Sequence, residues 1–229
     1  MIHRPKLSVI IPVWNEIKTV EEAVRRIYAL DVDKEIIVID DFSTDGSREL
    51  LRKLRPELKL KLILHAKNKG KGAAVKAGIA HAKGEYVVVE DADSELDPND
   101  ILKMLSQIEN DQSIDLIAGT RIFPQNANIT TGLARWVTRL GILILFQRNI
   151  TDPLCAYKLC KLSKFKGLKI QSERFGIEAE WLVKGIKKGW KINEFPVKYI
   201  PRGKKEGKKI ELKDGFDIVA QLIKLRFSS

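Results

Sequence analysis

Four acidic residues follow a run of valines in the segment VVVEDADSEL, residues 87–96. Asp91 and Asp93 are two positions apart, so on an extended chain their carboxylates face the same way, and Glu95 continues that side. Buried charge without a partner is costly, so these acids either form a solvated turn or share a cation. Mg²⁺ and Mn²⁺ prefer oxygen ligands and complete their shells with phosphate and water. The spacing leaves both alternatives open.

Two other polar segments follow apolar runs. Asp40 and Asp41 end EIIVID and begin DDFSTDGS, which can offer acceptors to a ribose or base, or form a plain turn with Ser47 capping a helix. In NKGKGAAVKAG, residues 68–78, glycines and lysines precede a helix. This pattern suits a phosphate near a helix N-terminus or a tight turn for close packing. The segment has neither the Walker A ending nor GxGxxG.

Strand-like and helix-like stretches alternate through the first half of the chain. We expect strands at 7–13, 35–40, 61–65, 85–91 and 114–120, and helices at 19–30, 43–54, 71–82 and 97–109. Apolar strands in such alternation predict an α/β fold with a Rossmann-like, mostly parallel sheet flanked by helices. Ligands of such sheets bind beyond the carboxyl ends of the strands. The segments PVWNE, DDFSTDG and EDADSE should therefore meet at one edge.

The second half has a different pattern. It predicts helices at 131–146 and 175–189, a strand at 191–199, a basic loop in IPRGKKEGKKIELKDG and an amphipathic terminal helix. We expect one catalytic domain over 1–213. Its nucleotide-binding half covers about 1–120 and its acceptor half about 121–200, while 201–229 form the basic loop and terminal helix.

Composition narrows the function classes. The 229 residues are 44% hydrophobic, enough for one substantial domain. The net charge of +11 favours an anionic partner such as a phosphorylated substrate, an acidic membrane or nucleic acid. No nucleic-acid-binding motif is present, so we expect no nucleic acid. Two cysteines make no disulfide framework, and no stretch reaches the roughly 20 apolar residues of a membrane span.

Six motifs together resemble the family 2 glycosyltransferases of the GT-A fold, in the branch of polyprenyl (dolichyl) phosphate mannose and glucose synthases. They are SVIIPVWNE, IIVIDDFSTDGS, NKGKGAAVKAG, GEYVVVEDADSELDP, GTR and FGIEAEWLVKGIKKGWKINEFPV. They occur in the expected order over residues 6–213. The resemblance implies a GDP- or UDP-linked sugar donor, a Mg²⁺ or Mn²⁺ ion and inversion at the anomeric carbon.

The resemblance also implies roles for individual residues. We expect the nucleotide sugar to contact Pro12, Trp14, Glu16, Asp41, Lys71, Asp91 and Ala92, and the cation to be held by Asp91, Asp93 and Glu95. Trp14 replaces a common tyrosine and keeps the ability to stack on a base. The expected catalytic residues are Asp93, Arg121, Arg135, Asp152 and Lys158. Tyr157 lies in the same matching segment as Asp152, and Glu178 and Glu180 match an acidic pair.

The chemistry depends on the acceptor. A cation on Asp91 and Asp93 would stabilise the departing diphosphate. A polyprenyl phosphate is already ionised, so positioning by Arg121, Arg135 and Lys158 would suffice. A saccharide hydroxyl, the alternative acceptor in polysaccharide or glycan assembly, needs a carboxylate base, for which Asp152 and Glu178 are the candidates. A more remote alternative is a non-catalytic sugar-nucleotide-binding protein.

The expected location is the cytoplasmic face of a membrane, by peripheral association and without a transmembrane segment. Arg135 and Arg139 lie four positions apart on the 131–146 helix, and the terminal helix has a wide apolar face. The basic loop between them in the sequence carries Arg202, Lys204, Lys205, Lys208 and Lys209, which favour anionic headgroups. The alternative is that both helices pack on the domain or at a homodimer interface, or contact a partner membrane protein.

Overall fold

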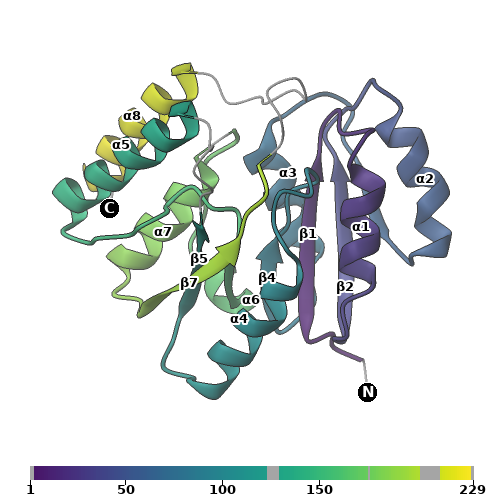
Figure 1. The fold of residues 1–229 in the computed structure, drawn as a ribbon, viewed down its shortest axis with the longest axis horizontal. Coiled ribbons are helices and arrows are strands. Elements are labelled where there is room, and N and C mark those ends of the chain that lie inside the picture. The colour runs from purple at the N-terminus through teal and green to yellow at the C-terminus, as the bar shows by residue number, and fades with distance from the viewer. Residues whose placement is uncertain (1–2, 123–128, 175, 202–211, 228–229) are drawn as a thin grey trace.

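The computed structural model describes residues 3–122, 129–174, 176–201 and 212–227. A seven-stranded sheet with the order β3-β2-β1-β4-β6-β5-β7 runs through the molecule. Figure 1 shows helices on both of its faces, with α1 and α2 at one end of the molecule and α5, α7 and α8 at the other. The predicted α/β fold with a mostly parallel, helix-flanked sheet is confirmed.

The described elements follow the predicted alternation. The strands are β1 (Leu7–Val13), β2 (Lys34–Asp40), β3 (Lys61–Leu64), β4 (Tyr86–Val89), β5 (Leu116–Ile122), β6 (Lys158–Lys161) and β7 (Ile192–Lys198). The helices are α1 (Val20–Tyr28), α2 (Ser47–Glu57), α3 (Lys71–His81), α4 (Asn99–Asn110), α5 (Ile129–Phe146), α6 (Leu162–Lys166), α7 (Ile177–Lys187) and α8 (Leu212–Phe227).

The central strands are apolar on both faces because helices cover both. In β1, Val9 and Ile11 join one hydrophobic cluster while Ile10, between them, joins the other. The first cluster includes the inner sides of α1, α2 and α4. The second includes those of α3, α6 and α7. Burial on both faces makes these strands continuous apolar runs, which is the signal that the sequence carried.

Strand β6 interrupts the parallel pattern. It pairs antiparallel with β4 on one side and with β5 on the other, so β5 is not the neighbour of β4. The sequence left 151–159 as a loop or short strand, because the extended part of this region is only four residues long. An antiparallel strand starts where its parallel neighbours end. Residues 152–157, which lead into β6, therefore lie at the carboxyl ends of β4 and β5.

The terminal helix α8 packs on the domain. Ile218, Leu222 and Leu225 are buried and belong to the same hydrophobic cluster as Ile142 of α5 and Ile177 of α7. The sequence left open whether the terminal helix binds a membrane or packs on the domain. One apolar face of α8 is covered by the domain. The basic loop residues between 202 and 209 lie outside the described residues. No helix in the described ranges is long and apolar enough to cross a membrane.

Candidate active site

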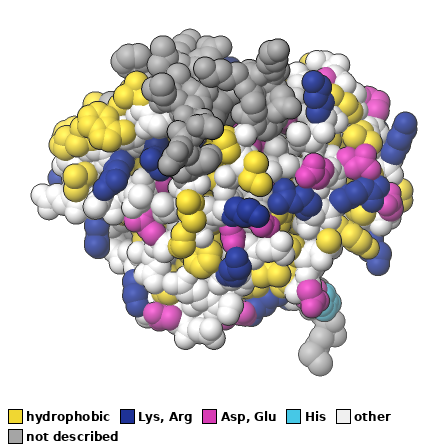
Figure 2. Space-filling model, viewed as in Figure 1, with side chains coloured by type: hydrophobic (Ala, Val, Ile, Leu, Met, Phe, Trp, Pro, Cys, Tyr) yellow, Lys and Arg dark blue, Asp and Glu magenta, His cyan; other side chains and the backbone are white. Residues whose placement is uncertain are grey.

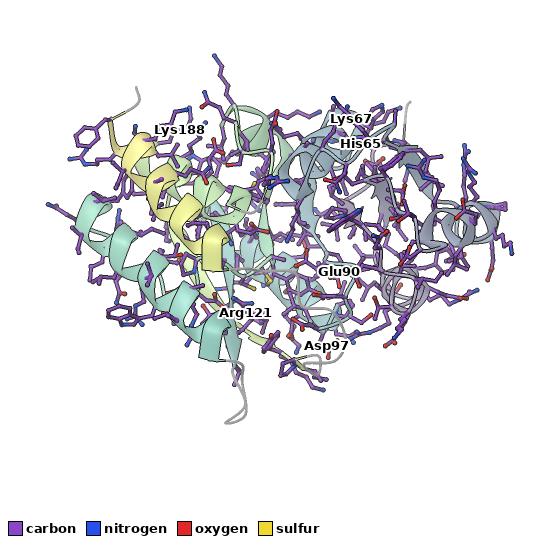
Figure 3. All side chains as sticks on the ribbon, turned by 90° about the horizontal axis from the view of Figure 1, so that it is seen from above. His65, Lys67, Glu90, Asp97, Arg121 and Lys188 are labelled. Atoms are coloured by element: carbon purple, nitrogen blue, oxygen red, sulfur yellow. The ribbon has the colours of Figure 1, made fainter. Side chains whose placement is uncertain are left out.

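The site lies at the carboxyl edge, defined here as the edge where the parallel strands end. The loops after β1, β2, β3 and β4 meet there, together with the end of β5 and the segment that leads into β6. Seen from above in Figure 3, Glu90 at the end of β4 lies between His65 on one side and Arg121 on the other. The edge therefore brings together the three polar segments that the sequence placed on it.

Asp41 is buried and holds the loop after β3. Its Oδ1 accepts the backbone N–H of Lys69 at 2.9 Å, and its Oδ2 accepts that of Gly70 at 2.7 Å. The Nδ1 atom of His65 lies 2.7 Å from Oδ1. The carboxylate expected to accept hydrogen bonds from a base or ribose is thus already engaged within the chain. Contact between Asp41 and a nucleotide stays a prediction. In the structure the carboxylate stabilises the glycine-rich loop by accepting two of its backbone N–H groups.

Residues 172–173 pack against the N-terminus of α3, and phosphate binding there stays a prediction. The backbone N–H of Ala73 donates to the carbonyl of Glu173 at 3.0 Å. A Cβ atom on Gly70 or Gly72 would lie 2.5 Å from the carbonyl oxygen of Glu173 or Ser172, respectively. These glycines therefore serve the close approach of residues 172–173, the tight-packing role that the sequence left open.

Lys71 joins the donor side of the edge to α7. Its Nζ lies 2.6 Å from Oδ1 of Asp91 and 2.5 Å from Oε1 of Glu178. Burial alone would lower the pKa of Lys71, but the charges of Asp91 and Glu178 outweigh it and raise that pKa. Burial would likewise raise the pKa of Glu178, but Lys71 and then Lys158 lower it. Lys71 and Glu178 are therefore both ionised at neutral pH.

The acid segment offers oxygen atoms to a hard cation but no complete cage. In the ranges that the structure describes, no three His, Cys, Asp or Glu side chains converge on a metal position. Oδ1 of Asp93 accepts the backbone N–H of Glu95 at 3.1 Å, which turns the segment back on itself. Next to it, the buried hydroxyl of Ser94 has no hydrogen-bond partner among the described residues. A cation here fits only with further oxygen atoms from a bound diphosphate, and Glu95 as a third ligand stays a prediction.

Arg121 and Asp152 form a buried, two-point ion pair. The guanidinium donates to Oδ2 at 2.7 Å through Nε and to Oδ1 at 2.9 Å through Nη2. Burial opposes the charge on Arg121, but Asp152 outweighs it and raises the arginine pKa. The guanidinium also lies 5.4 Å from the ring centre of Tyr199, at the end of β7. The pairing fixes the plane of the guanidinium at the carboxyl edge.

Lys158 is completely buried, which differs from its expected place beside a substrate. Its ammonium donates to the carbonyl of Pro153 at 3.1 Å and to that of Cys155. Burial lowers its pKa. The side chain stabilises the 153–155 loop in this structure and does not reach the open edge. The sequence missed this because lysine is seldom fully buried.

Glu90 and Tyr157 form a second buried pair, which the sequence did not predict. The phenol hydroxyl donates to Oε2 of Glu90. Burial, and after it the neighbouring charges of Asp91 and Asp93, raises the pKa of Glu90 well above its usual value, against the hydrogen bond from Tyr157. The sequence contained evidence for this pair, because a glutamate directly after a buried run of valines needs a hydrogen-bond or charge partner.

The remaining predicted residues lie on the same edge or on α5. Trp14 is 42% exposed, Ala92 is buried in the core, and Glu16 supports the start of α1, where its Oε2 accepts the hydroxyl of Thr19 at 3.1 Å. Pro12 is half-buried within β1. Arg135 is half-buried on α5, and Arg139 one turn later donates to Asn149 at 2.9 Å. Contact of these residues with a substrate stays a prediction.

Comparisons with known proteins agree on one family. A family model described as Glycosyl transferase family 2 matches residues 8–171. The dolichol-phosphate mannosyltransferase of Pyrococcus furiosus is 32% identical over 211 residues, covering 89% of this chain and 59% of the relative. The dodecaprenyl-phosphate galacturonate synthase of Rhizobium johnstonii is 30% identical over 203 residues, covering 86% of this chain and 60% of the relative. The chain thus spans about 60% of the length of these two relatives.

Solved structures agree on the fold. The glucosyl-3-phosphoglycerate synthase of Mycobacterium tuberculosis, in complex with Mn²⁺, UDP and glucosyl-3-phosphoglycerate, superposes with a TM-score of 0.75 at 19% identity. The match covers 96% of this chain and 80% of that one. The complex of the same synthase with UDP alone gives a TM-score of 0.77 at 18% identity, covering 97% and 80%. The GT-A fold is therefore confirmed.

Proposed function

Because the chain belongs to glycosyl transferase family 2, we propose that it transfers a hexose from a GDP- or UDP-linked sugar to a polyprenyl phosphate, with inversion and with help from a divalent cation. The observation that carries the proposal is the meeting of Asp91, Asp93, Lys71 and Arg121 at the carboxyl edge of the sheet. The names of the two curated relatives support a phosphorylated lipid as acceptor.

The residues at this edge suit a diphosphate leaving group. Asp91 and Asp93 would hold the cation together with diphosphate oxygens, and the cation would stabilise the negative charge that develops on departure. Lys71 already stands 2.6 Å from Asp91, so its positive charge is available to the same diphosphate. Trp14, half-exposed beside this edge, offers a ring face for the base.

The ion pairs favour an acceptor that is already ionised. A saccharide hydroxyl would need a carboxylate base, and the two candidates are Asp152 and Glu178. Asp152 is held by two hydrogen bonds from Arg121, and Glu178 is bound to Lys71, which helps keep its pKa low. Both carboxylates are therefore already paired with a cation of the chain. A phosphate acceptor needs no base, and Arg121 is fixed where a phosphate can be positioned.

An exposed apolar face on α5 supports peripheral association with a membrane. Leu133, Trp136, Leu140 and Leu143 recur at helical spacing and are between 37% and 58% exposed. Figure 2 shows hydrophobic side chains gathered over α5 and α8 at one end of the molecule. Apolar residues flanked by Arg135 and Arg139 match a helix that lies in a headgroup layer. Such a face would bring the carboxyl edge to a lipid-borne phosphate.

The activity test measures transfer from GDP-mannose, UDP-glucose and UDP-N-acetylglucosamine, with Mn²⁺, to a short polyprenyl phosphate or to an oligosaccharide. We expect one donor to react with the lipid phosphate alone. Asp93→Asn should lower the rate by at least about a hundred-fold, because it removes a carboxylate beside the developing charge. Asp97→Asn, the same change near the start of α4, is the matched control. Transfer only to the oligosaccharide would refute the acceptor assignment.

The membrane test is flotation with vesicles that contain anionic lipid. The double variant Trp136→Glu, Leu140→Glu should remain in the soluble fraction while the wild type floats. Tyr28→Glu changes a similarly exposed aromatic on α1 and should float normally. Flotation of the double variant at the wild-type level would exclude α5 as the membrane-binding face.

A further inference from the structure

Left-handed backbone conformations occur in three loops of the candidate active site. Six residues other than glycine have a positive φ in the described ranges. Lys59, Gln147 and Lys169 follow within three residues of the ends of α2, α5 and α6, where left-handed residues ordinarily terminate helices. The other three lie in the loops after β1, β2 and β4. They are Asn15, Phe42 and Ser94, with φ of 52°, 66° and 58°.

Phe42 is the unusual member of this group. Asparagine tolerates the left-handed region, and the Oδ1 atom of Asn15 also accepts the backbone N–H of Thr44 at 2.8 Å. Serine is small. A bulky aromatic residue with positive φ is a strained outlier. Burial of the ring does not offset this strain, because Phe42 is 41% exposed. Strain that the surrounding structure maintains is a pointer to function.

The surroundings fix the Phe42 ring in place. The guanidinium of Arg48 lies 5.5 Å from the ring centre. Arg48 is itself held by Oδ2 of Asp40 at 2.6 Å and by the carbonyl of His65 at 2.7 Å. Because these two contacts position the Arg48 guanidinium, it forms a fixed cation–π contact with the Phe42 ring. An exposed aromatic ring on a fixed support is prepared for contact with another flat group.

The loops that carry Phe42 and Trp14 are joined. The backbone N–H of Asn15 donates to Oγ of Ser43 at 2.9 Å, and Oδ1 of Asn15 accepts from Thr44 in return. The backbone N–H of Asp41 donates to the carbonyl of Val13 at 2.8 Å, which extends the pairing of β1 and β2 into these loops. Two half-exposed aromatic side chains thus stand at the ends of adjacent strands, in loops that hydrogen bonds join.

We propose that Phe42 is a base-contacting residue of the nucleotide site, which presents its ring face to the nucleobase of the donor alongside Trp14. This inference depends on the proposed function, because it assigns a further contact to the same donor. Stacking on an aromatic face is tolerant of base identity. The left-handed backbone of Phe42 leaves its large ring exposed at a turn of the chain.

The test compares Phe42→Gly with the wild type, by calorimetric titration with UDP, GDP and inorganic pyrophosphate at a fixed Mn²⁺ concentration. Glycine relieves the left-handed strain while it removes the ring, so thermal stability should be unchanged or higher. Affinity for the nucleotide that binds the wild type should fall about ten-fold, the loss expected for one stacking contact. Affinity for pyrophosphate, which has no base, should not change.

Two further variants complete the test. Lys59→Gly relieves the same kind of strain away from the site and should leave nucleotide affinity unchanged. Phe42→Asn keeps a residue that tolerates positive φ and should lose as much affinity as Phe42→Gly; it also provides the measurement if the glycine variant does not fold. Wild-type nucleotide affinity in the Phe42 variants, or an equal loss for pyrophosphate, would overturn the inference. Absence of UDP and GDP binding by the wild type would instead overturn the proposed function.

Discussion

Replacing Lys71 by methionine should destabilise the protein in a pH-dependent way. Methionine keeps the length and apolar stem of the side chain but removes the charge between Asp91 and Glu178. The side chains of Lys71 and Glu178 are only 16% and 10% exposed, whereas that of Asp91 is 31% exposed. Removing one partner of a buried ion pair costs about 3–5 kcal/mol. Because water reaches Asp91, we expect the lower end, about 3 kcal/mol.

The pH dependence identifies the cause. The pKa of Glu178 is below its usual 4.5 in the folded protein, so its stabilising contribution is present above 4.5 and is lost as pH falls through the folded pKa. In Lys71→Met, burial with one cation fewer raises that pKa, so ionised Glu178 destabilises the variant at neutral pH. As pH falls, protonation of Glu178 removes this destabilisation of the variant. The difference in unfolding free energy between wild type and variant should therefore narrow between about pH 7 and pH 4.

The assay is urea unfolding at both pH values, with thermal unfolding at neutral pH, where about 3 kcal/mol corresponds to roughly 9 °C for a chain of this size. Adding Glu178→Gln to Lys71→Met should restore most of the lost stability, because the two side chains are coupled. Lys191→Met is the matched control, since it breaks an exposed pair with Asp111 and should have little effect. A deficit that is equal at both pH values, or that Glu178→Gln does not reduce, would refute the reasoning.

Two further predictions concern buried groups near the same edge. The pKa of Glu90 is raised in the folded protein, so its contribution is full below its usual 4.5 and is lost as pH rises toward the folded value. Glu90→Gln, which still accepts the Tyr157 hydroxyl, should therefore raise the unfolding free energy near pH 7 but not near pH 4; equal effects at both would contradict this. Gly72→Ala should cost about 2 kcal/mol in urea unfolding, since the new Cβ would lie 2.5 Å from a backbone oxygen. Gly132→Ala, where nothing lies within 4 Å, should cost nothing, and an equal loss there would contradict the packing argument.

The parts of the fold that follow from local patterns were predictable. The β1 strand occupies residues 7–13 as expected, because its apolar run is continuous and a turn segment ends it. The acids after β2 and β4 come to one edge because parallel strands end on the same side. Strand β6 was not predictable in this way. Its sequence KLCK shows no long apolar run, and its two lysines suggest an exposed segment, yet Lys158 is buried within the sheet.

The partners of individual side chains were less predictable than their positions. The sequence places Asp41 at the carboxyl edge, but the amides of Lys69 and Gly70 that occupy its oxygen atoms come from a loop more than 25 residues later. The pairing of Lys71 with Glu178 connects segments over 100 residues apart. Charge and spacing identify which groups belong to the edge. They do not determine which of those groups neutralise each other, because that depends on how distant loops pack.

One chain of contacts connects the C-terminal helix to the donor side of the site. Glu180 of α7 is fully buried and accepts the backbone N–H groups of Gln171 and Ser172 at 2.8 and 2.7 Å. Nε2 of Gln221, on α8, lies 3.3 Å from the same carboxylate. Residues 172–173 in turn cover the N-terminus of α3, immediately beside Lys71. The position of Lys71, and hence of Asp91, therefore depends on residues 171–173, which hydrogen bonds attach to α7 and which contact the start of α3. The glycines at positions 70 and 72 allow this close approach, because a Cβ atom at either would lie 2.5 Å from a backbone oxygen of residues 172–173.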